Sequence, residues 1–460
     1  MPRPEDPFDS ISPADYRYWD PQVAEYLSEN ASTKAKLRVE VELVRVLAEL
    51  GLCSPAVLAE VEQACSEVTT EEVYREEDRI KHDIRALVNC IRARVSDEAK
   101  PFVHRCATSF DIIDTANAWR YQQVYREVLL SALRELIQTL ADLAKREAGT
   151  VQIGRTHGQH AVPITFGFAI AGYAYRLVGS YVELRQKSDR LEGKISGAVG
   201  AYNASALLLA DPVAYEAKVL RGLGLRPAIH STQIAPPEPL ARLLSETVVM
   251  MGVVANLARD MRNLQRTEIA EVGEPFGKAQ VGSSAMPQKR NPINFENIES
   301  NWKIILPRIL TVFMDQVSEH QRDLTNSASG RTYAEVVEYA VHALKRMNSM
   351  MSKLVVDREN MERNLAMTQG MVLAEPLQVL LASYGHPDSH EAVRLLTLRA
   401  QAEELSLVEA IQDTPDIAEW VARMDESQQA ILRDPSAYTG IAKGKTLAVV
   451  EHTLNRLRLS

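Results

Sequence analysis

The stretch Phe102–Ala148, FVHRCATSFDIIDTANAWRYQQVYREVLLSALRELIQTLADLAKREA, contains neither glycine nor proline. In its second half, leucines recur at alternating spacings of three and four residues, at Leu129, Leu133, Leu136, Leu140 and Leu143. This spacing places the leucines on one face of a helix and predicts an apolar seam. At 1.5 Å per residue, a helix of about forty residues would be about 60 Å long. We therefore expect a long helix that packs against other helices along its whole length.

Two further stretches have the same character. Residues 331–369 contain no glycine or proline, and residues 240–272 contain only Gly252. Helices this long need partners, and a bundle assembled from several chains supplies them. No strand-rich region, Gly-rich phosphate loop or internal repeat stands out. We predict an all-α fold with an N-terminal helical region at 1–106, a central long-helix bundle at 107–357 and a C-terminal helical region at 358–460.

The composition of the 460 residues is that of a soluble globular protein, with 46% hydrophobic and 25% charged residues. The net charge of −9 argues against a general nucleic-acid surface. No uninterrupted apolar run reaches the length of a membrane span, and the N-terminus lacks the apolar core of a secretory signal. The four cysteines form no CxxC pair. We expect a cytoplasmic protein that binds neither nucleic acid nor membrane, with no metal site and no disulfide framework.

A polar loop interrupts the helical pattern at residues 282–292, GSSAMPQKRNP. Gly282 permits unusual backbone conformations, and Pro287 and Pro292 prevent a helix. Lys289 can place a positive charge where a carboxylate or an enolate-like anion develops, and a serine hydroxyl can bind an anion or, if activated, accept a proton. A loop this polar between apolar helices is expected to carry function.

This loop resembles the GSSxMPxKxNP loop shared by the fumarase/aspartase superfamily of lyases, and its Lys-Arg-Asn-Pro ending is most similar to the adenylosuccinate lyase family. The resemblance extends over nearly the whole chain. It implies a three-part, all-α fold whose central helices form a twenty-helix core in a homotetramer, with each active site drawing segments from three subunits.

The segment Gly154–Gln159, GRTHGQ, is poor helix material and leaves room for a ligand near its backbone. Histidine, with an ordinary pKa of about 6.5, can give or take a proton near neutral pH. Most isolated histidines are structural, but this segment resembles one in the family. The resemblance implies that His157 is the general acid and that Thr156 contacts the substrate.

Thr108 and Ser109 precede a long helix and are good N-cap candidates, although hydroxyls at a helix N-terminus also bind carboxylates well. The resemblance implies that both hold the succinyl carboxylate and that Gln233, in a Ser-Thr-Gln segment, contacts the same group. Cys106 departs from the glycine of many relatives. The segment Lys194–Gly200 also matches, and we expect it mainly to pack backbone.

The segment Gln321–Arg331 carries two arginines nine residues apart with hydroxyls between them, an arrangement that can clamp a phosphate. A capped helix start with exposed charges is the alternative. A motif at Ser12–Tyr18 and a His-Asp pair also match the family. The resemblance implies that the nucleotide side of the substrate is bound by Arg17, Tyr18, His82, Asp83, Arg322, Ser327 and Arg331.

The implied reaction is β-elimination of fumarate from adenylosuccinate to give AMP, with succinyl-aminoimidazole-carboxamide ribotide as a second substrate in purine biosynthesis. Ser283 is the implied base and His157 the acid. Lys289 and Asn291 are expected to stabilise the doubly charged intermediate. No metal or organic cofactor is implied.

Three alternatives remain open at this point. The first is an argininosuccinate lyase, because those enzymes have Gln at the position of Gln288, whereas adenylosuccinate lyases often have His or Tyr there. A carboxymuconate cycloisomerase would share the fold but would not need the phosphate clamp. A catalytically silent helical scaffold is the third, and the presence of Ser283, Lys289 and His157 argues against it.

Overall fold

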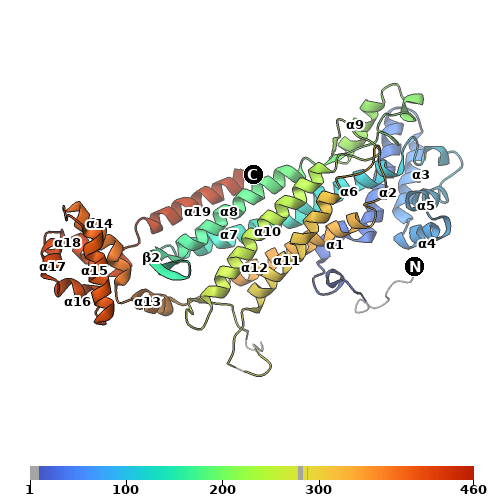
Figure 1. Cartoon of the computed structure of the whole chain (residues 1–460). Coiled ribbons are helices and arrows are strands. Elements are labelled where there is room, and N and C mark those ends of the chain that lie inside the picture. The colour runs from blue at the N-terminus through green and yellow to red at the C-terminus, as the bar shows by residue number, and fades with distance from the viewer. Residues whose placement is uncertain (1–9, 278–282, 287, 460) are drawn as a thin grey trace. The chain divides into compact units, whose positions relative to one another are not determined.

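The computed structural model describes residues 10–277, 283–286 and 288–459 (Figure 1). Helices dominate these residues, as predicted. The Gly- and Pro-free stretch forms three consecutive helical segments of 16, 5 and 17 residues. They are α6 (Ser109–Val124), a π-helical segment (Tyr125–Leu129) and α7 (Leu130–Arg146). The predicted seam is real, since all five of its leucines are buried.

Four further long helices run alongside one another (Figure 1). They are α8 (Phe166–Ser188), α10 (Glu238–Leu264), α11 (Ile293–Met314) and α12 (Tyr333–Met351). Tyr173 of α8 donates a hydrogen bond to Asp260 of α10, and Arg308 of α11 pairs with Glu335 of α12. Side-chain contacts of this kind tie neighbouring helices together along the bundle.

Two of the predicted helical stretches end earlier than their freedom from Gly and Pro suggested. Beyond α12 the chain forms strand β6 (Val355–Val356), which pairs antiparallel with β5 (Val272–Gly273). Valine favours extended backbone. Asp357 then accepts the Asn360 backbone N–H and begins α13 (Arg358–Ala366). The absence of helix breakers therefore did not mark where these helices stop.

The chain divides into two compact units, and the dividing points fall inside the long helices. The first unit comprises the residues up to Leu133 together with 180–252 and 300–345. Its apolar core gathers residues such as Leu43, Ile91, Ile112 and Val219. Its remaining elements are α1 (Pro21–Leu27), α2 (Glu29–Glu49), α3 (Pro55–Glu67), α4 (Thr70–Ile80), α5 (Asp83–Arg92), α9 (Pro212–Gly222), and the short parallel strands β3 (Glu192–Gly193) and β4 (Arg226–Pro227).

The second unit comprises residues 134–179, 253–299 and 346–460. Here Ile153 of a β-hairpin packs with Leu377, Leu381 and Leu407 in a separate core. The hairpin strands are β1 (Val151–Thr156) and β2 (Gln159–Thr165). The later helices are α14 (Ala374–Ser383), α15 (Ser389–Ala402), α16 (Leu407–Gln412), α17 (Pro415–Ala422), α18 (Glu426–Arg433) and α19 (Ala442–Leu459).

Helix α10 is the one continuous helix in the described residues that is long and apolar enough to cross a membrane. The bent pair Arg358–Ala366 and Met371–Ser383 passes the same test only if it is taken as one span. However, 56% of the most apolar window of α10 is buried inside the protein. Such burial is what a core helix shows.

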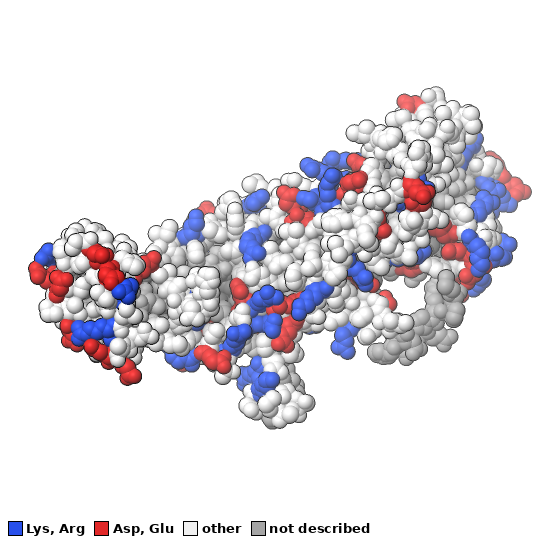
Figure 2. Space-filling model, viewed as in Figure 1, with Lys and Arg blue, Asp and Glu red and all other residues white. Residues whose placement is uncertain are grey.

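Acidic and basic side chains are interspersed on the face shown in Figure 2.

Candidate active site

His157 lies at the tip of the β1–β2 hairpin. Thr156 pairs with Gln159, so His157 and Gly158 form a two-residue loop. Both have positive φ, 53° and 75°. Positive φ at both central positions is what a type I′ turn requires, and it matches the twist of the two strands. The turn is unusual for a histidine, and it leaves both Thr156 and His157 exposed.

A buried carboxylate anchors this hairpin. Glu271 is fully buried and accepts hydrogen bonds from Gln152 Nε2 at 2.7 Å and from Arg155 Nη2 at 2.6 Å and Nη1 at 3.1 Å. It also accepts one from Asn364 Nδ2 of α13 at 2.8 Å. The two bonds from one guanidinium fix orientation as well as distance. No local pattern points to Glu271, because its partners lie about a hundred residues away on either side.

Ser283 lies in the loop between α10 and α11. Its Oγ accepts hydrogen bonds from the backbone N–H of Met286 at 3.1 Å and of Ala285 at 3.4 Å. Lys289 is exposed and Asn291 is half-buried. Gly282 and Pro287, which frame this loop in the sequence, lie outside the described residues. Donation from two N–H groups to one oxygen favours its anionic form.

The two ends of this loop are held at its base. Glu274 accepts from the backbone N–H of Asn294 at 2.9 Å and of Phe295 at 2.8 Å, and so caps the start of α11. The Arg290 guanidinium lies 5.0 Å from the centre of the Phe276 ring. The loop that carries Ser283 and Lys289 therefore leaves and rejoins the protein at fixed points.

In the first unit, Thr108 is the N-cap residue of α6, and Ser109 is its first residue. The Thr108 backbone N–H donates to Asp111 Oδ2 at 2.8 Å. The capping interpretation is thus confirmed for Thr108 and not for Ser109. It is compatible with carboxylate binding, because the N-terminal N–H groups of a helix attract anions.

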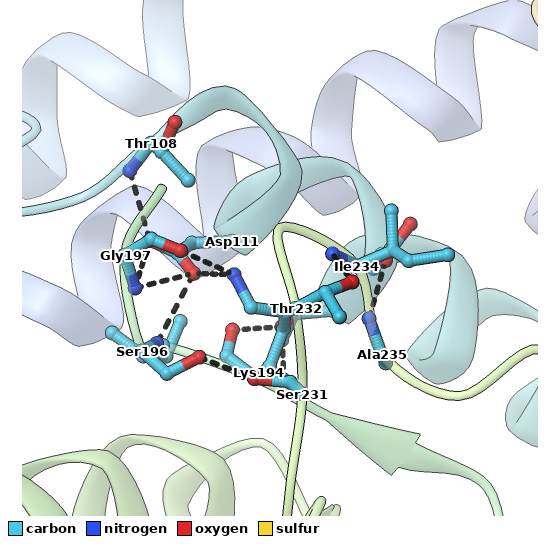
Figure 3. A network of polar contacts seen from close by, with 12 residues as sticks. Thr108, Asp111, Lys194, Ser196, Gly197, Ser231, Thr232, Ile234 and Ala235 are labelled. Carbon is cyan, nitrogen blue, oxygen red and sulfur yellow. Dashed lines mark hydrogen bonds and ion pairs between the residues drawn. The ribbon is translucent and has the colours of Figure 1, made fainter. Parts of the chain in front are cut away.

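Asp111 is also the centre of a buried network that we call the Asp111 network: Thr108, Asp111, Lys194, Ser196, Gly197 and Ser231 (Figure 3). Its carboxylate pairs with the Lys194 ammonium. It also accepts the backbone N–H groups of Ser196 and Gly197, each at 3.2 Å. The segment Lys194–Gly200 therefore does more than pack backbone, since its lysine is a fully buried ion-pair partner.

Gln233 and Arg322 lie in the same part of the first unit. The Gln233 backbone N–H donates to the carbonyl of Gln321 at 3.3 Å. The Arg322 guanidinium lies 5.4 Å from the centre of the Phe110 ring on α6. Its buried Nε has no hydrogen-bond partner within the described structure. The structure thus brings Ser109, Gln233 and Arg322 to one end of α6.

Asp114, one turn after Asp111 on α6, holds the loop that carries Gln233. Asp114 Oδ2 accepts the Ala235 backbone N–H at 2.9 Å. Burial raises the pKa of Asp114 to about 6, although this bond and the nearby cations Lys194 and Arg322 oppose the rise. The carboxyl is therefore partly neutral in mildly acidic solution.

His82 is the N-cap residue of α5, and its Nδ1 accepts the Arg85 backbone N–H at 3.2 Å. This bond assigns the ring proton of the neutral tautomer to Nε2, which can then donate to an anion. Burial lowers the pKa of the nearby Lys36, and the positive charge of Arg331 lowers it further. The negative charge of Asp83, next to His82, opposes this lowering. The sequence interpretation missed Lys36, a basic residue close to the predicted site residues Asp83 and Arg331.

Arg17 and Tyr18 follow a short 3₁₀ turn, and Tyr18 lies against α12. The Tyr18 ring lies 5.1 Å from Tyr339 and 4.8 Å, edge-on, from His342. Arg17 is exposed. Ser327, in the Arg322–Arg331 segment, is exposed as well, and its backbone N–H donates to Leu324 at 3.1 Å.

The predicted residues thus belong to two groups in one chain. The five predicted for the chemical step and its neighbourhood are in the second unit: Thr156, His157, Ser283, Lys289 and Asn291. The ten predicted to hold the substrate are in the first unit: Arg17, Tyr18, His82, Asp83, Thr108, Ser109, Gln233, Arg322, Ser327 and Arg331.

A second buried pair lies just before Thr108. Glu40 is fully buried, and it accepts the His104 backbone N–H at 3.0 Å and contacts the ring Nδ1 at 2.7 Å. His104 has a φ of 60°, so both bonds hold a strained position. Burial opposes a charge on this ring, but the Glu40 carboxylate outweighs it and the pKa of His104 is raised.

This pair predicts a pH-dependent stability. A raised pKa in the folded state means that the contribution is fully present below about pH 6.5, the ordinary histidine value, and is lost as the pH rises through the folded value. We expect His104→Gln to destabilise the protein by about 1–3 kcal/mol in acid solution and by less at alkaline pH. Melting temperatures across this pH range test it, with the exposed His230→Gln as control. An equal loss at both ends of the range would contradict it.

Nearly the whole chain matches two known protein families. Residues 12–305 match the family described as "Lyase", and residues 318–431 match the family described as "Adenylosuccinate lyase C-terminal". A relative named adenylosuccinate lyase from Pyrococcus horikoshii is 36% identical over 450 residues, 96% of this chain and 98% of the relative. One of the same name from Archaeoglobus fulgidus is 34% identical over 444 residues, again 96% of this chain and 98% of the relative.

Solved structures support the same fold. A 3-carboxy-cis,cis-muconate lactonizing enzyme from Pseudomonas putida has a TM-score of 0.83 and 26% identity, with 95% of this chain and 98% of that one covered. A fumarate lyase from a Mesorhizobium species has a TM-score of 0.84 at 24% identity, with 94% and 98% covered. The predicted fumarase-type all-α fold is confirmed. By sequence, the chain belongs to the adenylosuccinate lyase family.

Proposed function

We propose that this enzyme eliminates fumarate from adenylosuccinate to give AMP, and from succinyl-aminoimidazole-carboxamide ribotide, in purine biosynthesis in the cytoplasm. The observation that carries the proposal is the likeness over 96% of the chain to relatives named adenylosuccinate lyase. The structure adds an exposed histidine on an anchored hairpin and a hydroxyl that accepts two backbone N–H groups.

In the proposed mechanism, Ser283 as its alkoxide removes a proton from the carbon next to a carboxylate. The electrons delocalise into that carboxylate, and Lys289 and Asn291 stabilise the doubled negative charge. The carbon–nitrogen bond then breaks, and a carbon–carbon double bond forms to give fumarate. His157 donates a proton to the departing nitrogen. Donation from the Met286 and Ala285 N–H groups supports the alkoxide, because hydrogen bonds to a charged form favour it.

The remaining predicted residues bind the substrate in this proposal. Thr108, Ser109 and Gln233 hold the succinyl carboxylate, and Thr156 contacts the substrate near His157. The nucleotide side is held by Arg17, Tyr18, His82, Asp83, Arg322, Ser327 and Arg331. We further propose a homotetramer with a twenty-helix core and sites shared between subunits, three helical regions at 1–106, 107–357 and 358–460, and chemistry that needs no cofactor.

The nucleotide-side assignment predicts a binding defect. Arg331→Gln removes one charge-assisted contact to phosphate, which is worth about 1.5–3 kcal/mol. We expect the KM for adenylosuccinate to rise about 10- to 100-fold with kcat little changed, since the contact is the same in substrate and transition state. Arg75→Gln, at an exposed surface pair on α4, is the control. A fall in kcat with an unchanged KM would place Arg331 elsewhere in the mechanism.

The experiment that tests the function is a substrate panel. Purified protein is mixed separately with adenylosuccinate, the succinyl-carboxamide ribotide, argininosuccinate and carboxymuconate, and products are identified by mass spectrometry. Fumarate with AMP from the first supports the proposal. Turnover of argininosuccinate alone would show that Gln288 is the better guide. Turnover of carboxymuconate alone would match the activity in the name of the Pseudomonas relative and reject the purine assignment.

A further inference from the structure

The Asp111 network buries a full ion pair that no catalytic role explains. Asp111 and Lys194 both have a relative exposure of 0%. The pair is tied further by the Lys194 ammonium donating to the Gly197 carbonyl at 3.1 Å and by Thr115 Oγ1 donating to the Lys194 carbonyl at 2.9 Å. A buried ion pair is often no more stabilising than apolar residues of the same volume. Its value here must therefore lie in geometry.

The network connects three segments that are far apart in the sequence: the start of α6, the segment Lys194–Gly200, and Ser231. One Asp111 carboxylate accepts the Thr108 backbone N–H at the start of α6 and the N–H groups of Ser196 and Gly197. Ser196 Oγ then hydrogen-bonds Ser231 Oγ at 2.7 Å. Figure 3 shows this chain of contacts running from Thr108 through Asp111 to Ser231.

The second and third of these segments also lie in direct backbone contact. A Cβ at Gly200 would lie 2.0 Å from the Ser231 carbonyl oxygen, and Gly200 has a φ of 78°. Only glycine fits there. After Ser231 the chain turns tightly, with the Thr232 N–H donating to the Ile234 carbonyl at 3.1 Å. Asp114 holds the end of that turn through Ala235. Gln233 thus lies between Ser231, which is linked to Asp111 through Ser196, and Ala235, which is held by Asp114.

We propose that the Asp111 network, through its Ser196–Ser231 bond, is a positioning device that sets the spacing between the α6 N-terminus and Gln233 to fit the dicarboxylate part of the substrate. This inference rests on the proposed function, which supplies the fumarate-forming substrate. Asp111, Lys194, Ser196 and Ser231 act through Thr108, Ser109 and Gln233. The network sets the affinity for fumarate and leaves the affinity for AMP unchanged.

The test removes the link between the segments without removing the charges. Ser231→Ala deletes one hydroxyl, Ser196→Ala deletes its partner, and the double variant deletes both. Binding of fumarate and of AMP is measured separately by calorimetry, alongside KM, kcat and a melting curve. Ser188→Ala is the matched control, because Ser188 is also buried but its Oγ donates to the Arg185 carbonyl within the end of its own helix.

We expect Ser231→Ala to weaken fumarate binding about 3- to 10-fold, the size of one hydrogen bond, and to change AMP binding by less than about twofold. The double variant should be no weaker than Ser231→Ala, because both changes remove the same bond. Ser188→Ala should leave both affinities unchanged.

Three results would contradict the inference. Unchanged fumarate binding in Ser231→Ala, an equal loss of AMP binding, or a loss that Ser188→Ala shares would overturn the inference. Failure of the proposed function is a separate result. Wild-type protein that binds fumarate but turns over no succinyl-purine would reject the function, and the Ser231→Ala comparison would still decide the inference. Wild-type protein that does not bind fumarate would overturn both.

Discussion

Ser283→Ala is expected to lower kcat for adenylosuccinate cleavage by about 10²–10⁴-fold, the usual contribution of a positioned general base. The KM should change little, because the base acts on a proton that moves only in the transition state. The change removes the oxygen that accepts the Met286 and Ala285 N–H groups and leaves the loop anchored at Glu274. Steady-state kinetics with fumarate release as the readout measure it.

The neighbouring serine supplies the control for this experiment. Ser284 is exposed in the same loop, and Ser284→Ala should change kcat by no more than a few-fold. If Ser284→Ala abolished activity and Ser283→Ala did not, the base would be assigned to the wrong hydroxyl. Equal losses in the two variants would mean that the loop, rather than one oxygen, was damaged.

Lys194→Met is expected to have the largest effect on stability. It leaves the Asp111 carboxylate buried without its cation, and removing one partner of a buried pair costs about 3–5 kcal/mol. Lys100→Met, at an exposed pair with Asp97, should cost no more than about 0.5 kcal/mol. Urea unfolding at one fixed protein concentration compares the variants, because the proposed tetramer would make stability depend on concentration.

A double variant separates the ion pair from simple packing damage. Asp111→Asn combined with Lys194→Met removes both charges, so it should regain a substantial part of the stability that Lys194→Met loses. If the double variant were less stable than Lys194→Met alone, the loss would come from packing or from the lost N–H contacts, and the stranded charge would not be its cause.

The fold was predictable from sequence because a long helix produces a pattern within its own stretch of residues. The leucine seam from Leu129 to Leu143 and the absence of Gly and Pro over residues 102–148 indicate a helix with no knowledge of distant contacts. The ends of the helices were less predictable. Val355 and Val356 form a strand because Val272 and Gly273 pair with them, and no pattern of local breakers records that pairing.

The candidate site shows the same division between local and distant information. Segments such as GRTHGQ at Gly154–Gln159 are compact and can be recognised in one stretch of sequence. The hairpin that displays His157 was not predicted, because a turn with two positive φ values depends on the strands beside it. Glu271 and Lys194 were missed for a related reason. Each acts through partners about eighty or more residues away, so no spacing links them.

A π-helical turn holds one more residue than an α-helical turn, and at about 100° per residue that extra residue rotates everything beyond it. The segment Tyr125–Leu129 therefore sets the angular phase between the Asp111 face of α6 and the seam that begins at Leu129. A one-residue deletion inside it would restore a regular helix and turn one face against the other. Point substitutions keep that phase, so along this helix a change of length should be far less tolerated than a change of residue.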